Sequence, residues 1–562
     1  MNDLLIRDVL IVDGSGAPPF HGDVAIDSGR VTEVGETAQT ARQVVNGNGL
    51  ALAPGFIDSH THYDAQITWD PWTTPSVSLG VTSVLMGNCG FTIAPCSEAD
   101  RELTLANLTQ VEGMSLKALT SGTRWAFESF SEYLDFLAES GVGPNVGCYC
   151  GHSSLRLAVM GEASTERSAT ADEISEMQVL LAEALEAGAA GFATSTFEGH
   201  NGKGGRPMPS RLADETELRA LVSTLGLHGS GSFMLTKGST TTMTFLESLA
   251  ADSGRPVMVA ALLVDNLNPD RIFIELDAIH AANGRGHSMM GQVSCSPMIM
   301  DFRLDSAYPF EILDTWQQVI PIYSDHDRLR QIYGDPDFRN GVRADLKRDV
   351  AVREYTPQFD RIHLIGVHDE RFASDVGNSI EQAARRDNKD PVDWFLDCGI
   401  ESGFSAEFSA EILNVDEVLV SRVLKHPGAN LSLSDAGAHL TLFCDAGFGL
   451  HTLGHWVRER EELSLAEAVR LLTSAQADAY GLVERGRITP GYHADLLLFD
   501  PSTIGRSPRY LVSDLPAGAS RFTTDAIGIH GIWINGQRVA DPSGMLDVAP
   551  PGEVMRSFAV SD

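Results

Sequence analysis

The sequence predicts an α/β protein, a (β/α)8 TIM-like barrel with a small β-sandwich domain formed by both chain ends. Short runs rich in β-branched residues stand near both ends of the chain, and buried apolar runs alternate with helical stretches between them. The 562 residues exceed the roughly 250 of a single barrel and leave room for an accessory domain. Hydrophobic residues make up 43% of the chain and charged residues 21%, as in ordinary folded proteins.

Short strands are predicted at both chain ends. Residues 4–12 (LLIRDVLIV) mix apolar and polar positions and are rich in β-branched side chains. Near the other end, residues 494–500 and 528–540 have the same character, and Asn535-Gly536 is a strong hairpin turn signal. Segments from opposite ends can complete one sheet, so we expect a single small domain. Its expected parts are residues 1–53 and 488–549.

Eight buried apolar runs between the two ends are expected to be the barrel strands. Helical stretches separate several of them, for example 171–188 and 214–226, and this alternation is typical of a parallel barrel. A ninth apolar run, 361–368, lies in a charged stretch from about 296 to 430, which we expect to be an elaborated loop over the barrel mouth. The expected barrel covers 54–487. Its expected strands are 55–62, 82–90, 145–151, 188–195, 231–236, 255–263, 287–294 and 430–435.

Charge and cysteine content exclude several kinds of partner. The 76 acidic against 41 basic residues leave a formal net charge of −35, which repels phosphate backbones and anionic lipids. Seven cysteines at no framework spacing are typical of a reducing compartment. Charged residues interrupt the N-terminal segment where a secretory signal would be apolar, and no apolar run is long enough to span a bilayer. We expect a cytoplasmic protein that acts on a small-molecule substrate and binds neither nucleic acid nor membranes; a homo-oligomer is left open.

His60 and His62 close the first predicted barrel strand. Residues two apart in a strand share one face, so both imidazoles can point into the barrel at its C-terminal end. Active sites of barrel enzymes lie at that end, and neutral imidazole is a favoured ligand of zinc. The pair therefore indicates a metal site; the alternative is two polar turn residues.

The segment 54–62 (PGFIDSHTH) resembles the start of the metal-dependent amidohydrolase superfamily. Further motifs resemble the N-acyl-D-amino-acid deacylase (D-aminoacylase) family, and this resemblance extends over essentially the whole chain, including the split β domain. It implies a barrel enzyme that hydrolyses amide bonds with the help of bound metal. The motifs are GNCG (87–90), SDAGAH (434–439), RGR (485–487), Gly491 and Ala494-Asp495.

The resemblance implies roles for individual residues. In that family, the His-x-His pair and the aspartate of the last strand form one metal position, which here means His60, His62 and Asp435. The other position combines a cysteine after strand two, which matches Cys89, with one histidine from each of strands five and six. His60, His62 and Asp435 are therefore the expected ligands, with Cys89 as an additional candidate.

The two histidines of the second metal position are missing. Thr236 stands where the first is expected, and Ala261 or a neighbour replaces the second. We therefore expect one zinc, or another divalent metal, per chain. In that family, a lysine two residues after the strand-six histidine binds the carboxylate of the substrate. Here this position falls near Leu263, and no arginine follows Asp435 until Arg458. This predicts a neutral or bulky apolar substrate and weak activity on simple N-acetyl-D-amino acids.

The predicted reaction is hydrolysis of a carbon–nitrogen amide bond by a metal-activated water. Asp435 would take a proton from the water and pass it to the leaving nitrogen. His152, after strand three, would polarise the carbonyl or act as an extra ligand; a structural histidine is the equal alternative. Cyclic amides, esters or lactones would use the same groups. A non-catalytic metal-binding barrel is the remaining alternative.

Three other residues are candidates for contact with the substrate. His200 lies in a glycine-rich loop after strand four. The alternative is that this loop only connects two elements. Lys237, at the end of strand five, is a substrate contact, a carbamylated ligand or an ordinary surface lysine. His439, four residues after Asp435, is expected to line the pocket. The sequence places Glu112 only in a loop of unknown position.

Overall fold

The computed structural model describes residues 1–265, 267–348, 356–440 and 445–559. By contacts between its residues the chain divides into two units. Unit 1 consists of 1–262, 274–295 and 421–562, and unit 2 of 263–273 and 296–420. The domain boundaries expected from the sequence stay predictions.

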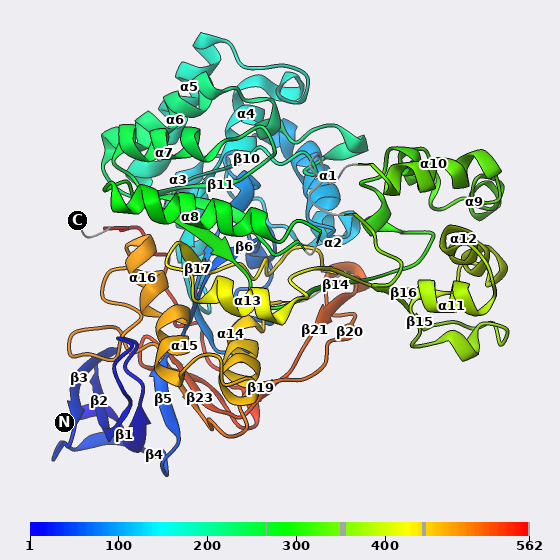
Figure 1. Cartoon of the computed structure of the whole chain (residues 1–562). Coiled ribbons are helices and arrows are strands. Elements are labelled where there is room, and N and C mark those ends of the chain that lie inside the picture. The colour runs from blue at the N-terminus through cyan, green and yellow to red at the C-terminus, as the bar shows by residue number, and fades with distance from the viewer. Residues whose placement is uncertain (266, 349–355, 441–444, 560–562) are drawn as a thin grey trace. The chain divides into compact units, whose positions relative to one another are not determined.

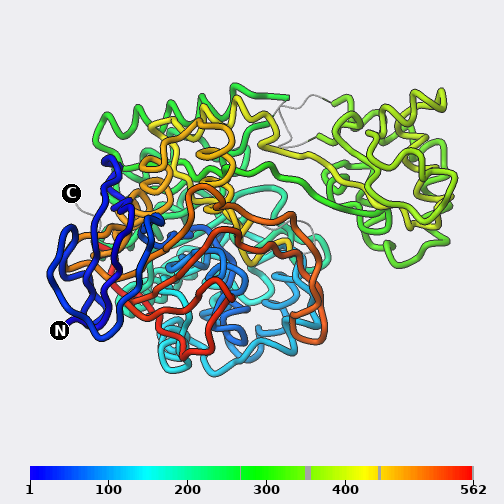
Figure 2. Tube along the Cα trace, turned by 90° about the horizontal axis from the view of Figure 1, so that it is seen from below, coloured from blue at the N-terminus to red at the C-terminus, as the bar shows by residue number. Residues whose placement is uncertain are grey.

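A nine-stranded sheet in unit 1 joins both ends of the chain, in the order β25-β24-β23-β18-β5-β1-β2-β3 with β4 beside β1. The two ends meet where β5 pairs antiparallel with β18, and Figure 2 shows the blue N-terminal strands beside orange and red C-terminal segments. Apolar side chains of these strands, among them Leu4, Val24, Leu496 and Trp533, share one buried core. Its arrangement as a sandwich stays a prediction. The strands are β1 Asn2–Ile11, β2 Phe20–Asp27, β3 Arg30–Gly35, β4 Ala41–Asn46, β5 Ala51–Pro54, β18 Leu496–Phe499, β23 Ile529–Ile534, β24 Gln537–Asp541 and β25 Gly544–Met545.

Parallel strands form two more sheets of unit 1, β6-β7-β8 and β9-β10-β11-β12-β13-β17. Each of the eight predicted strand segments overlaps an observed strand. Beyond the sheets, Thr61 at the end of β6 forms a parallel bridge with Ala436, which follows β17. The fold is therefore mixed α/β, with strands paired in chain order. The strands are β6 Phe56–Thr61, β7 Val81–Met86, β8 Asn145–Cys148, β9 Cys150–Gly151, β10 Gly191–Ser195, β11 Ser232–Thr236, β12 Val257–Leu262, β13 Met289–Val293 and β17 Ala429–Leu431.

Helices follow the parallel strands, and α5, α6 and α7 lie side by side next to β10 and β11 in Figure 1. The helix predicted at 171–188 is confirmed as α5: Thr170 and Glu173 form a capping box at its start, and Gly188 ends it at φ 107°. Within the described ranges, no helix is both long and apolar enough to cross a bilayer. The helices are α1 Arg101–Val111, α2 Leu116–Gly122, α3 Phe130–Ser140, α4 His152–Met160, α5 Ala171–Ala187, α6 Glu215–His228, α7 Met243–Ser253, α8 Asp270–Gly284, α13 Glu417–Leu424, α14 Phe448–His451, α15 Leu465–Leu472 and α16 Ser474–Tyr480.

Unit 2 has its own secondary structure, so the expectation of a loop for this stretch is wrong. The ninth apolar run, 361–368, contains strand β15, which pairs antiparallel with β16. Aromatic residues far apart in the sequence form a buried core, so the local pattern gave no sign of it. The core includes Phe302, Phe310, Trp316, Phe395 and Phe408. The elements are β14 Met298–Phe302, β15 Ile362–Gly366, β16 Glu407–Leu413, α9 His326–Tyr333, α10 Pro336–Leu346, α11 Ile380–Arg386 and α12 Pro391–Glu401.

Candidate metal centre

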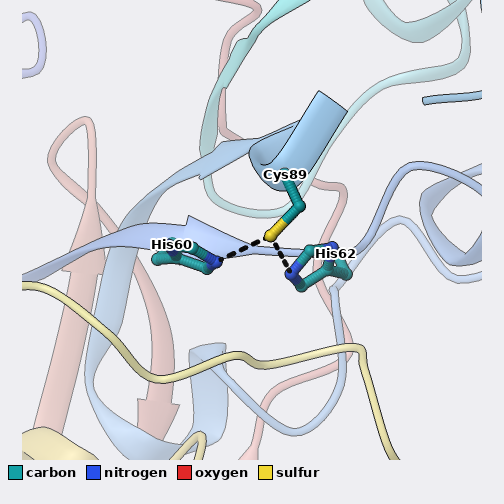
Figure 3. Close-up of side chains that lie close together, drawn as sticks. All are labelled: His60, His62 and Cys89. Carbon is teal, nitrogen blue, oxygen red and sulfur yellow. Dashed lines mark hydrogen bonds between the residues drawn. The ribbon is translucent and has the colours of Figure 1, made fainter. Parts of the chain in front are cut away.

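Three buried side chains from the ends of β6 and β7 point toward one another. His60 lies in β6 and His62 just beyond it, on the same face because strand residues alternate. Cys89 lies in the turn after β7, and its Sγ is 3.6 Å from Nε2 of His60 and 3.9 Å from Nε2 of His62 (Figure 3). Their ligand atoms all lie within 4.8 Å of one another, which is close enough to surround a metal ion.

The turn that carries Cys89 depends on glycine. Gly87 and Gly90 have φ values of 86° and 75°, which L side chains rarely adopt. A Cβ at Gly90 would also lie 2.6 Å from the carbonyl oxygen of Ala193. Cys89 itself has a φ of 57°, an unfavourable conformation for a residue other than glycine. Such strained residues cluster at functional sites.

Asp435 completes the cluster from the segment after β17. Its Oδ1 is 2.9 Å from Nε2 of His62 and 3.5 Å from Nε2 of His60. Its backbone is also left-handed, with a φ of 57°, and its N–H donates to the carbonyl oxygen of His60. The structure therefore brings together all four residues that the sequence analysis named as metal ligands.

The second ring nitrogen of each histidine has a partner, and the sequence analysis did not identify either one. Nδ1 of His60 is 2.8 Å from Oε1 of Gln292, whose amide donates to the hydroxyl of Tyr480. Nδ1 of His62 is 3.0 Å from Oε1 of Glu112. Because an amide oxygen can only accept a hydrogen bond from Nδ1–H, the contact with Gln292 leaves Nε2 of His60 as an acceptor, the state that binds a metal. The donor set therefore fits a divalent cation.

Burial and charge set the protonation of the ligands. Burial lowers the pKa of His60 to about 4, so its imidazole is neutral near pH 7. Burial alone would lower the pKa of His62, but the carboxylates of Glu112 and Asp435 outweigh it and raise that pKa. For Asp435, burial is outweighed by the hydrogen bond and the charge of His62, which hold its pKa below the usual range. Asp435 is therefore a carboxylate at neutral pH.

Thr236, which stands in place of one of the two missing histidines, lies beside the cluster. Its Oγ1 is 3.1 Å from Sγ of Cys89. A threonine hydroxyl is a weaker ligand for zinc than imidazole or thiolate. Thr236 therefore does not replace the missing imidazole of the second metal position.

His152 and Lys237 are engaged with other protein groups. His152 is fully buried, with Nδ1 2.7 Å from the hydroxyl of Thr194 and Nε2 2.9 Å from the carboxylate of Glu217. This favours the structural alternative, because both ring nitrogens are occupied. Nζ of Lys237 is 2.9 Å from the carboxylate of Glu275, so this lysine has an ion-pair partner. Their roles in catalysis or substrate binding stay predictions.

His200 and His439 lie near the metal ligands. Nε2 of His439 is 3.9 Å from Oδ2 of Asp435. Nδ1 of His200 is 2.6 Å from the hydroxyl of Ser195. Burial lowers the pKa of His200 to about 3. Contact of these two histidines with the substrate stays a prediction.

Two cavities flank the ligand pair His62 and Asp435, and they share no lining residue. The non-atom space of the His62 cavity is about 250 Å³ and that of the Asp435 cavity about 300 Å³, with adjoining open solvent included. Arg521 lines the Asp435 cavity and binds the carboxylate of Asp514 and the carbonyl oxygen of Thr74. The sequence analysis missed this cation because it lies far along the chain from every motif. The His62 cavity is lined by His62, Asp64, Ala65, Phe91, Leu108, Glu112, Met114 and Leu119, and the Asp435 cavity by Tyr63, Thr74, Pro75, Asp435–Ala438, Leu440, Asp445, Ala446, Arg521 and Phe522.

Replacing Gln292 with leucine is expected to weaken metal binding by about 10- to 100-fold, because His60 would lose the partner that orients its ring and selects its tautomer. Titration of the metal-free protein with zinc in competition with a chelator measures this change. Gln292→Glu is the matched control, since it retains an oxygen acceptor for Nδ1 of His60. Equal affinities in the leucine variant and the wild type would show that Gln292 does not orient the ligand.

Comparison with known proteins agrees with the site. The chain matches the model of the amidohydrolase family over residues 43–287 and 419–540. It is 29% identical to N-acyl-D-aspartate deacylase of Alcaligenes xylosoxydans xylosoxydans, over 98% of this chain and 95% of that protein. A structure of D-aminoacylase, which has a binuclear metal centre, matches with a TM-score of 0.66 at 24% identity, covering 99% of this chain and 100% of that chain.

A structure with bound zinc is also similar. N-acyl-D-glutamate deacylase from Bordetella bronchiseptica, in complex with zinc and a phosphonate inhibitor, matches with a TM-score of 0.66 at 25% identity, covering 99% of this chain and 100% of that chain. These relatives confirm the resemblance that the motifs indicated. Since the family model also covers more than half of the residues, this chain belongs to the amidohydrolase family.

Proposed function

We propose that this protein hydrolyses the amide bond of an N-acylated amino acid. The observation that carries the proposal is the convergence of His60, His62, Cys89 and Asp435 at the ends of three strands, with a carboxylate oxygen 2.9 Å from a ligand nitrogen. The deacylase relatives, similar over almost their whole length, support the same reaction. The convergence of four ligand side chains argues against the non-catalytic alternative.

One zinc ion per chain is the proposed cofactor, held by His60, His62 and Asp435 with Cys89 as a further ligand. A zinc ion in such a site supplies Lewis acidity toward a carbonyl oxygen and a water molecule. Asp435 accepts a proton from the attacking water and delivers it to the leaving nitrogen. His439, next to Oδ2 of Asp435, is placed to contact the substrate on this side.

We also propose that strands β6 to β13, together with β17, close into the expected barrel. Neighbouring strands in each of the two sheets are parallel, and the bridge between Thr61 and Ala436 connects the first strand with the segment after the last. The metal ligands would then lie at the C-terminal ends of the strands, where barrel enzymes have their active sites. The similarity to solved amidohydrolase structures supports this arrangement.

Purified protein is expected to contain about one metal equivalent per chain. Zinc takes three or four protein ligands, and Thr236 cannot replace an imidazole at a second position. Mass-spectrometric metal analysis of protein purified without added metal measures the content. Two tightly held equivalents would contradict the prediction and would point to a ligand that replaces the missing histidines.

N-acetyl-D-methionine is expected to be a better substrate than N-acetyl-D-aspartate, by about tenfold or more in kcat/KM. Arg521 offers one cation to a substrate carboxylate, but it already binds Asp514, and the Asp435 cavity contains further carboxylates. A second substrate carboxylate would therefore be buried without a partner. Hydrolysis measured on both compounds, their L isomers, and ester and lactone analogues tests the function. No amide hydrolysis by zinc-loaded protein would refute it, and faster ester or lactone cleavage would favour that alternative.

A further inference from the structure

The two cavities beside the metal ligands differ in chemistry. An N-acyl substrate has two halves, the acyl group and the amine, joined at the bond that is cleaved. Under the proposed function, Asp435 must deliver a proton to the leaving nitrogen, so this nitrogen lies on the side of Asp435. The amine half then occupies the Asp435 cavity, which Arg521 also lines. The His62 cavity adjoins the other side of the ligand pair and has apolar walls, so it is the candidate for the acyl half.

The walls of the His62 cavity are suited to hydrocarbon. Leu108 comes from α1, Met114 and Leu119 from the segment 112–122, and Phe91 from the turn after Cys89. All four side chains are buried. Apolar walls favour a ligand with apolar surface by about 0.8 kcal/mol, or roughly fourfold in affinity, for each methylene that they bury.

Among the residues that the structure describes, the cavity offers no cationic side chain of lysine or arginine to an anionic ligand. Its polar lining residues are His62, Asp64 and Glu112, and Glu112 lies 3.0 Å from His62. Asp64 is 2% exposed, and its Oδ2 accepts the N–H of Gly87. An acyl chain that ends in a carboxylate would therefore find no lysine or arginine among the described residues that line this cavity.

We infer that the His62 cavity binds the acyl group of the substrate, that this group is a neutral and short hydrocarbon chain, and that Leu108 limits its length. This inference rests on the proposed function, since it assigns one half of the same substrate. Leu108 would then be a specificity determinant on α1, a helix that carries no metal ligand.

Leu108→Ala tests the inference by enlarging the cavity. The measurement is kcat/KM for the acetyl, butanoyl and hexanoyl derivatives of D-methionine. We expect the ratio of hexanoyl to acetyl to rise about tenfold or more above the wild-type ratio, because the removed side chain makes room for about two methylenes. Leu108→Phe should lower the same ratio. Ratios within one variant are independent of the fraction of active enzyme, so partial loss of metal or stability does not affect them.

Leu105→Ala is the matched control. Leu105 is a buried leucine of the same helix that does not line the His62 cavity, so its ratio should stay within about twofold of the wild type. Equal shifts in the Leu105 and Leu108 variants, or an unchanged ratio in both Leu108 variants, would overturn the inference. Faster hydrolysis of a glutaryl than of a pentanoyl derivative would also overturn it.

Binding of the product acids separates this inference from the proposed function. Calorimetry with acetate, butanoate and hexanoate on zinc-loaded protein measures acyl-group preference without turnover. If no derivative is hydrolysed, the proposed function fails. The cavity assignment then stands only if Leu108→Ala, and not Leu105→Ala, shifts carboxylate preference toward hexanoate. An unshifted preference overturns it.

Discussion

Replacing Asp435 with asparagine is expected to lower turnover by about 10² to 10⁴, while most of the metal stays bound. Asparagine has the same size and retains a carbonyl oxygen as a weak ligand, but it cannot accept a proton. His60 and His62 would still provide their Nε2 atoms, which lie 3.5 Å and 2.9 Å from the Asp435 carboxylate in the wild type. Metal analysis and kcat on the best substrate of the panel measure the two effects separately.

His60→Asn is the comparison variant for this experiment. It removes a ligand nitrogen and leaves the carboxylate of Asp435, so metal content and activity should fall together. Near wild-type turnover by Asp435→Asn would mean that another group carries the proton. The proposed mechanism would then be wrong, although the family assignment would stand.

Replacing Glu217 with alanine is expected to destabilise the protein by about 3 to 5 kcal/mol, the usual cost of breaking a buried ion pair. Glu217 and Arg156 are both fully buried, with Nη1 of Arg156 2.6 Å from the carboxylate. The same carboxylate contacts His152. Its loss leaves the buried Arg156 cation without a carboxylate, although its hydrogen bonds to the carbonyl oxygens of Ser164 and Arg167 remain. Thermal and denaturant unfolding of the wild type and the variant measure the loss.

A surface pair provides the control for Glu217. Glu173 binds the exposed Arg167, so Glu173→Ala should cost much less stability, because water screens exposed ion pairs.

The Glu217→Ala experiment also tests the role of His152. If Glu217→Ala keeps its stability but loses activity at full metal content, the interaction with His152 serves catalysis rather than the core.

The sequence predicted the parallel strands well because their signal is local. Each strand is a short run of buried apolar residues, and turn or helix signals bound it, as in the run that became β6. His60 and His62 could be placed on one face from spacing alone. The aromatic core of unit 2 could not be predicted, because Phe302 and Phe408 are far apart in the chain and contact only after folding.

By itself, the sequence determined the class of the fold, the family and the four candidate ligands, because these depend on motifs and on periodicity within single strands. Only the tertiary structure decided which groups surround the ligands. Gln292, Glu112 and Arg521 stand in segments without a recognisable motif, and each acquires its role from a partner distant in the chain. Side-chain contacts between such segments depend on packing in three dimensions, which no local pattern of residues encodes.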